Sequence, residues 1–242
     1  MNYKLLIAYD GTRYFGWQKT RSGPSIQEEL EQAATTVLQK ITSCEAASRT
    51  DRGVHARGQV VQVISPTERA PERLLAGMNA NLPLDIRVVE ASIVDETFHP
   101  TLNATSKTYT YHLCLSLAQN PFHRRFSWHY PHEIDLDALR QAAKLLAGTH
   151  DFSPFSTEPK PDSVRTLLNI DFSFPEKERL CITLTADRFL YKMARTLAGT
   201  LAYIGSGKLS PDIPEKLFSS LDRTLAGITA PPHGLCLDKV HY

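Results

Sequence analysis

The chain has 242 residues, of which 42% are hydrophobic and 22% charged, as is ordinary for a globular protein. The net charge of +1 excludes a broadly basic nucleic-acid-binding domain, so any nucleic acid must be bound by local groups of basic residues. No apolar run has the length of a membrane span or the form of a signal peptide. We therefore expect a soluble protein of the cytoplasm.

The first hundred residues alternate between strand-like and helix-like patterns. Strands are predicted over 3–10 and 86–94, near 59–64, and as a short extra strand around 46–48. A helix is predicted after Ser25, because Ser25 and Glu28 have the spacing of a capping box. A second helix begins at Pro71, a residue that suits the first helical turn. The resulting order, β-α-β-β-α-β, is typical of a ferredoxin-like unit.

The second half repeats this order. Strands are predicted over 108–115, 164–174, 180–185 and 234–241, with a hairpin turn at 175–179. Helices are predicted over 135–147 and 189–204, ended by Gly148 and Gly205. The expected fold is therefore α+β, with two ferredoxin-like halves, 1–104 and 105–242. Each half is expected to pack helices on one face of an antiparallel sheet, and the two sheets to form a central cleft.

The sequence around residue 51 places one carboxylate, Asp51, between Arg49 and Arg52. Guanidinium groups at this spacing favour the ionised carboxylate and also bind phosphate. Most surface ion pairs of this kind contribute little, so an inert solvated loop is the alternative. Gly53 permits a turn that other residues rarely adopt, and the loop leads directly into a predicted strand. This position at the end of a sheet favours a catalytic carboxylate.

Two residues of the second half are further candidates. Tyr109 shares one face of its predicted strand with Lys107 and Tyr111, where its ring either covers the sheet or stacks on a nucleobase. Arg195 lies outside the apolar stripe of its predicted helix. It therefore either points into solvent or faces an anion, and Asp51 is one such anion.

No pattern in the sequence is typical of a metal or cofactor site. The nine histidines lack metal-ligand spacing, and the four cysteines are far apart. Neither a phosphate-binding glycine loop nor a Gly-x-Ser-x-Gly elbow occurs. We therefore expect chemistry without a metal or cofactor. Local basic groups that remain as candidate anion contacts lie at 49–57, 123–125 and 192–195, and for the middle group a solvated surface is the favoured alternative.

Several motifs occur in a fixed order along nearly the whole chain. They include YDGTRYFGWQ at 9–18, RTDRGVHA at 49–56, FH at 98–99, GTHDFS at 148–153, MAR at 193–195 and APPHGL at 230–235. In type and order these motifs resemble those of the bacterial tRNA pseudouridine synthase A family. The resemblance implies a pseudouridine synthase fold and the isomerisation of uridine at positions 38, 39 and 40 in the anticodon stem and loop of tRNAs.

The resemblance also implies a role for individual residues. Asp51 matches the family's nucleophile, Arg195 the arginine that pairs with it, Tyr109 the tyrosine against the target uracil, and Arg49 the arginine that assists base flipping. The family usually has alanine in place of Arg52, which is then either a phosphate contact or an outward-pointing side chain. No cofactor is implied, and the expected assembly is a homodimer with one tRNA crossing both subunits.

Two alternatives remain at this stage. A catalytically inactive RNA-binding ferredoxin-like protein would keep an aromatic and basic surface but would not need Asp51 and Arg195 together. A hydrolase that uses Asp51 and His55 would need a second carboxylate or a triad partner, and the local sequence offers neither. The joint presence of Asp51, Tyr109 and Arg195 favours the isomerase.

Overall fold

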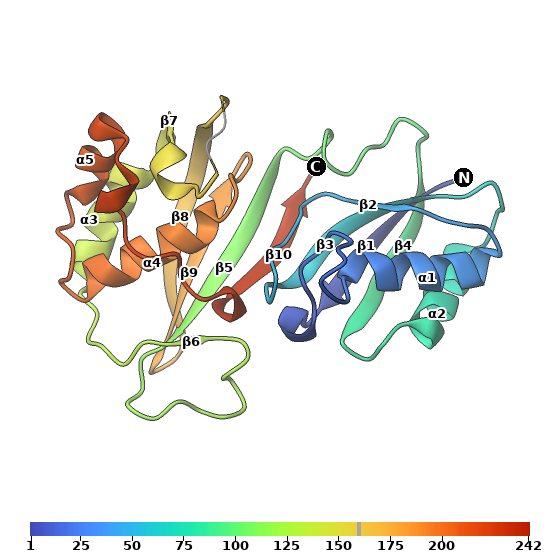
Figure 1. The fold of residues 1–242 in the computed structure, drawn as a ribbon, viewed down its shortest axis with the longest axis horizontal. Coiled ribbons are helices and arrows are strands. Elements are labelled where there is room, and N and C mark those ends of the chain that lie inside the picture. The colour runs from blue at the N-terminus through green and yellow to red at the C-terminus, as the bar shows by residue number, and fades with distance from the viewer. Residues whose placement is uncertain (159–160) are drawn as a thin grey trace. The chain divides into compact units, whose positions relative to one another are not determined.

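The computed structural model describes residues 1–158 and 161–242, which divide into two units (Figure 1). Unit 1 comprises Met1–Thr105 and Cys236–Tyr242, and unit 2 comprises Ser106–Leu235. The last strand of the chain therefore lies in unit 1, although the sequence places it in the second half. Both units combine helices with strands, so the predicted α+β class is confirmed.

The strands of unit 1 pair in the order β4-β1-β3-β10, with the short β2 beside β3. Their bounds are β1 (Asn2–Tyr9), β2 (Cys44–Ala46), β3 (His55–Ile64), β4 (Ile86–Val94) and β10 (Leu235–His241). All pairs are antiparallel except β3 with β10, which is parallel. The sheet thus departs at one pair from the antiparallel sheet expected from the sequence.

Helices α1 (Ile26–Leu38) and α2 (Pro71–Asn81) pack together on one face of this sheet (Figure 1). Ser25 caps α1, because its hydroxyl oxygen accepts a hydrogen bond from the Glu28 N–H at 3.3 Å. Pro71 occupies the first turn of α2, where no intrahelical partner for its nitrogen is needed. Both helix starts therefore agree with the sequence prediction.

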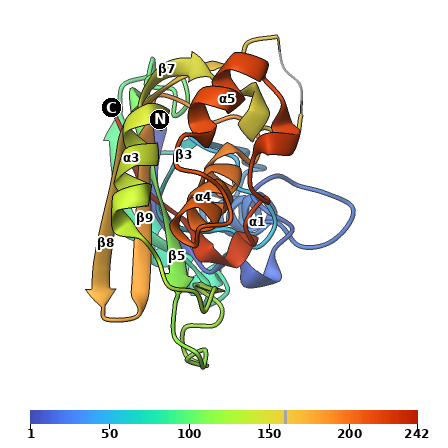
Figure 2. The same ribbon diagram turned by 90° about the vertical axis from the view of Figure 1, so that its left-hand side faces the viewer.

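Unit 2 has the strand order β5-β9-β8-β7, with the short β6 beside β5. Its strands are β5 (Ser106–Cys114), β6 (Trp128–His129), β7 (Gly148–Asp151), β8 (Val164–Glu176) and β9 (Arg179–Ala186). Helices α3 (Leu136–Leu146), α4 (Met193–Gly205) and α5 (Ile213–Ser220) lie on one face of the sheet (Figure 2). Among the described residues of this unit, β5 and β6 are parallel and the other strand pairs are antiparallel.

Unit 2 corrects the sequence prediction at several places. Helix α4 begins at Met193 and not at Phe189, because Lys192 has a φ of +60°, a left-handed conformation that ends a regular helix. The predicted stop of α3 is confirmed, because the helix ends at Leu146 with Ala147 as its C-cap and Gly148 follows at a φ of +107°; Gly148 is also the first residue of β7. Strands β6 and β7 and helix α5 are absent from the prediction, since each is too short to produce a clear periodicity.

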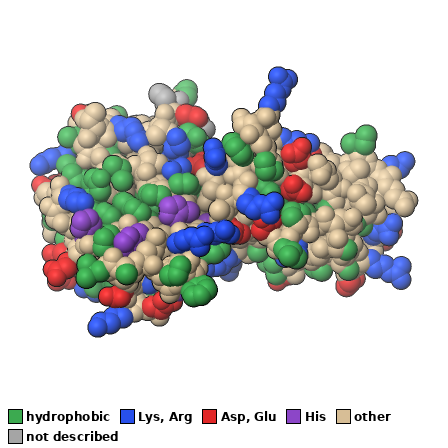
Figure 3. All heavy atoms as spheres, turned by 60° about the horizontal axis from the view of Figure 1, so that its bottom comes forward, with side chains coloured by type: hydrophobic (Ala, Val, Ile, Leu, Met, Phe, Trp, Pro, Cys, Tyr) green, Lys and Arg blue, Asp and Glu red, His purple; other side chains and the backbone are tan. Residues whose placement is uncertain are grey.

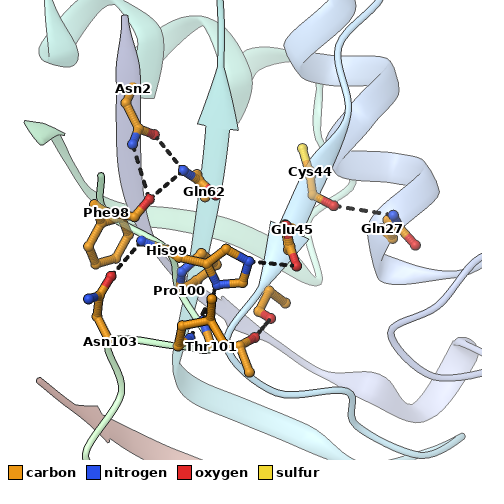
Figure 4. Close-up of polar contacts among 12 residues, drawn as sticks. Asn2, Gln27, Cys44, Glu45, Gln62, Phe98, His99, Pro100, Thr101 and Asn103 are labelled. Carbon is orange, nitrogen blue, oxygen red and sulfur yellow. Dashed lines mark hydrogen bonds and ion pairs between the residues drawn. The ribbon is translucent and has the colours of Figure 1, made fainter. Parts of the chain in front are cut away.

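A polar cluster fixes the segment that follows β4 (Figure 4). The Gln62 side-chain amide donates to the Phe98 carbonyl at 2.6 Å and to Asn2 Oδ1 at 3.0 Å. His99 Nε2 lies 3.3 Å from the Glu45 carboxylate, and the Thr101 hydroxyl donates to the Ala46 carbonyl at 3.1 Å. The segment is therefore tied to β1, β2 and β3 before the chain reaches β5.

The described residues contain no helix that is long and apolar enough to cross a membrane. All four cysteines are buried and free of disulfide bonds.

Candidate active site

Asp51 lies in the loop between β2 and β3 and is half-buried. The Val54 N–H donates to the Asp51 carbonyl at 3.1 Å, which closes a turn through Gly53 at a φ of +76°. Thr50 and Val54 are buried on either side of this turn, whereas Arg49 and Arg52 are exposed. The loop is therefore anchored at two buried residues and presents its charged side chains near solvent.

The motif at residues 9–17 holds this turn in place. The Tyr9 hydroxyl lies 2.7 Å from the Thr50 hydroxyl, and both groups are buried. The Trp17 N–H donates to the Thr50 carbonyl at 3.0 Å, and the Gly53 N–H donates to the Tyr14 carbonyl at 3.3 Å. Residues on both sides of Asp51 are thus hydrogen-bonded to one segment, which we call the 9–17 clamp.

Two glycines let the 9–17 clamp approach the turn this closely. A Cβ atom at Gly11 would lie 2.0 Å from the Val54 carbonyl oxygen. Gly16 has a φ of +99°, and a Cβ atom there would lie 2.7 Å from the Thr50 carbonyl oxygen. Any other residue at these positions would push the two backbones apart, which explains the glycines in the motif.

Arg52, where the resemblance implies an alanine, contacts the 9–17 clamp. Its guanidinium carbon lies 4.1 Å from the centroid of the Phe15 ring, within the range of a cation–π contact. Arg52 remains exposed, so the stacked guanidinium stays within reach of an anion in solvent.

Tyr109 lies on β5 with only 5% of its surface exposed. The Phe189 ring packs edge-on against the Tyr109 ring, with centroids 5.0 Å apart and planes at 79°. Phe189 belongs to the residues just before α4, which the sequence predicts as helical. Their irregular backbone therefore brings one aromatic ring against the candidate tyrosine.

Arg195 is the third residue of α4 and is half-buried. Its Nε donates to the Ala230 carbonyl at 2.8 Å, and the Ala230 N–H donates to the Arg195 carbonyl at 3.1 Å. The side chain and backbone of Arg195 are thus both tied to the APPHGL motif, a role for which the sequence gives no signal. The neighbouring Pro231 carbonyl accepts a hydrogen bond from the Tyr111 hydroxyl at 2.8 Å, which links the same motif to β5.

Lys107 shares a strand face with Tyr109, and only 7% of its surface is exposed. Burial, together with the nearby positive charge of Arg188, lowers the pKa of Lys107 to about 8. A buried cation of this kind next to a candidate substrate contact is uncommon in a structural role alone.

The structure thus assembles the candidates in two groups. Asp51, Arg49 and Arg52 share one loop of unit 1. Tyr109 and Arg195 lie in unit 2, where burial raises the pKa of Tyr111 and the charge of Arg195 opposes that rise. The pairing of Asp51 with Arg195 stays a prediction. Within residues 1–158 and 161–242, no three His, Cys, Asp or Glu side chains form a group that could hold a metal ion.

Comparison with known proteins places this α+β chain among the tRNA-modifying isomerases. The chain belongs to the tRNA pseudouridine synthase family, whose sequence profile matches residues 5–101 and 142–242. The resemblance seen in the sequence is thereby confirmed, and the fold agrees with that of this family.

Relatives of known name cover the chain over its full length. It is 44% identical to tRNA pseudouridine synthase A 2 of Protochlamydia amoebophila (strain UWE25), over 100% of this chain and 94% of the relative. It is 39% identical to tRNA pseudouridine synthase A of Thermoanaerobacter sp. (strain X514) and 38% identical to that of Bacillus pumilus (strain SAFR-032), each over 100% of this chain and 99% of the relative.

Proposed function

We propose that this protein converts uridine to pseudouridine at positions 38, 39 and 40 in the anticodon stem and loop of tRNAs. The observation that carries the proposal is the match of the whole chain to enzymes named tRNA pseudouridine synthase A. The buried anchoring of the Asp51 turn adds support, because a nucleophile must be held in a fixed geometry. The inactive RNA-binding alternative has no comparable support.

In the proposed reaction, the bond between uracil N1 and ribose C1′ breaks and a bond between C5 and C1′ forms. The C5 proton is released and N1 gains a proton, so atoms balance without an oxidant, a reductant or a cofactor. The Asp51 carboxylate attacks either C1′, as a retaining glycosidase nucleophile does, or C6 of the uracil ring. The detached base turns before C5 is joined to the ribose.

The other candidate residues support this chemistry. Arg195 pairs with Asp51, and the hydrogen bond from its Nε to the Ala230 carbonyl orients the guanidinium for that purpose. Tyr109 lies against the target uracil. The target nucleotide must leave its stack at a cost of a few kcal/mol, and Arg49 assists this step. Arg52, stacked on Phe15, contacts a tRNA phosphate.

The proposed assembly is a homodimer with one tRNA crossing both subunits. The modification is tested by tritium release from tRNA carrying [5-³H]uridine, with transcripts that keep only one uridine among positions 38, 39 and 40. We expect release from each of the three transcripts. A wild-type protein that binds tRNA but releases no tritium from any transcript would contradict the proposed reaction.

A further inference from the structure

The loop between β5 and β6, residues 115–127, carries an exposed aromatic ring that the proposed reaction does not use. Phe122 is 86% exposed. The loop extends away from the helices and strands of unit 2 in two perpendicular views (Figures 1 and 2). Figure 3 turns this end of the molecule forward, and hydrophobic, His, basic and acidic side chains are all visible on the surface of unit 2 there. A single exposed apolar side chain is ordinary on a protein surface, so a binding role for Phe122 has to be inferred from the residues around it.

Hydrogen bonds hold the loop in one conformation around Phe122. The Phe122 N–H donates to Asn120 Oδ1 at 2.9 Å, and the His123 N–H donates to the Asn120 carbonyl at 3.0 Å. The Phe126 N–H and the Ser127 hydroxyl both donate to the His123 carbonyl, at 2.9 and 3.0 Å. Two consecutive turns therefore present the ring to solvent, and little ordering would be needed for it to bind a partner.

The loop lies in the part of the sequence that is poorest in acidic residues. The 36 residues from 97 to 132 contain no Asp or Glu, although the chain has 26 in all. Arg124 and Arg125 follow Phe122 closely and are exposed. Two carboxylates at the β8–β9 hairpin approach the loop: Glu178 accepts from the Ser116 hydroxyl at 2.8 Å, and Glu176 lies 3.8 Å from His123 Nδ1. Glu176 is also paired with Arg179 at 3.2 Å.

We propose that this loop is an RNA-binding surface separate from the Asp51 turn. The Phe122 ring stacks on an unpaired nucleobase of the tRNA, and Arg124 and Arg125 bind neighbouring phosphates. Aromatic platforms beside backbone-binding cations are the usual means of binding single-stranded nucleotides. A chain of net charge +1 has to bind a polyanion through a local group of basic residues. The two arginines that closely follow Phe122 form such a group, and their charge favours RNA over a protein as the partner. The inference rests on the proposed function, which supplies the tRNA.

The test compares Phe122→Ala with Leu117→Ala, since Leu117 lies in the same loop, is 92% exposed and has no ring. The dissociation constant for a tRNA transcript is measured by fluorescence anisotropy. We expect Phe122→Ala to weaken binding about 10-fold or more, Phe122→Trp to keep wild-type affinity, and Leu117→Ala to have no effect. At saturating tRNA, kcat of the control Leu117→Ala should equal that of the wild type. Equal affinity of Phe122→Ala and Leu117→Ala would overturn the proposal.

Three further measurements test the role of Arg124, the oligomeric state and the enzyme activity. Arg124→Gln should reduce the slope of log affinity against log salt by about one, whereas Arg124→Lys should keep it. A change of oligomeric state in Phe122→Ala, measured by sedimentation, would instead assign the loop to contact with a second copy and overturn RNA binding. Tritium release by the wild type is recorded in parallel. Its absence would count against the proposed reaction, while the ratio of binding constants still decides the role of Phe122.

Discussion

Arg195 is the residue of α4 to which we assign a role in the proposed reaction, and Lys192 provides its control. Arg195 and Lys192 lie near the start of the same helix, yet only Arg195 is bonded to the APPHGL motif through both its side chain and its backbone. Arg195→Ala should therefore reduce kcat by at least about 100-fold, a loss typical of removing a fixed charged partner. Lys192→Ala should reduce it far less. Steady-state tritium release measures both, and equal losses in the two variants would refute the role of Arg195.

Lys107 gives a pH-dependent prediction. Folding lowers its pKa from 10.5 to about 8, so between these pH values the unfolded chain binds more protons and the free energy of unfolding rises with pH. Lys107→Met removes the cost of burying the charge. It should raise the free energy of unfolding at pH 7 by up to about 3 kcal/mol, and the gain should shrink as the pH approaches 10.5.

Urea unfolding at pH 7 and pH 10 measures this difference. The control is Lys144→Met, because Lys144 lies on an exposed face of α3. It should show no comparable dependence on pH. A Lys107→Met protein that is less stable than the wild type at pH 7 would mean that the ammonium group has a stabilising partner.

Among the elements, the 9–17 clamp is predicted to control catalysis through the position of Asp51. Tyr9→Phe removes one hydroxyl, which lies 2.7 Å from Thr50. We expect a fall in kcat of about 5-fold, the equivalent of one hydrogen bond, with KM unchanged. Tyr3 is the matched control. It lies on the same strand, is fully buried, and hydrogen-bonds to the Arg69 backbone, away from the Asp51 turn.

Tyr3→Phe and Tyr9→Phe should lower the melting temperature to a similar extent, since each loses a buried hydroxyl contact. Only Tyr9→Phe should change kcat. Similar kcat values for both variants would leave the 9–17 clamp with a role in stability alone.

The sequence predicts long, strongly patterned elements well. The alternation at 86–94 matches β4 residue for residue, and the Ser25 and Pro71 signals locate the starts of α1 and α2. The start of α4 is not predictable in this way, because Lys192 has a left-handed backbone conformation that residues with a Cβ atom rarely adopt. β7 is missed because Gly148 both follows α3 and begins the strand.

In the candidate site, too, the sequence predicts some features and only the structure reveals others. Asp51 stands out because it lies between two arginines, and this local pattern is visible in the sequence. The function of Tyr9 and Ala230 is not visible, because each acts on a residue at least 35 positions away in the chain. A hydrogen bond across such a separation leaves no periodicity or spacing to recognise. Arg52 likewise is explained only by its contact with the Phe15 ring.

At the scale of the whole molecule, the proposed residues come from both units of the chain. Unit 1 supplies Asp51 on an anchored turn. Unit 2 supplies Tyr109, packed against Phe189, and Arg195, bonded to the APPHGL motif. A near-neutral chain must then bind a polyanionic substrate with local basic groups, for which we propose the arginines near Asp51 and the loop that carries Phe122. Catalysis and tRNA binding should therefore be separable by mutation.

The most direct measurement is tritium release from [5-³H]uridine-labelled tRNA by the wild type and by Asp51→Asn, with tRNA affinity and melting temperature recorded for both. Asp51→Asn keeps the volume of the side chain and removes its charge. We predict that the variant folds and binds tRNA as the wild type does but releases no tritium. Release at the same rate from both proteins would contradict the assignment of Asp51 as the nucleophile.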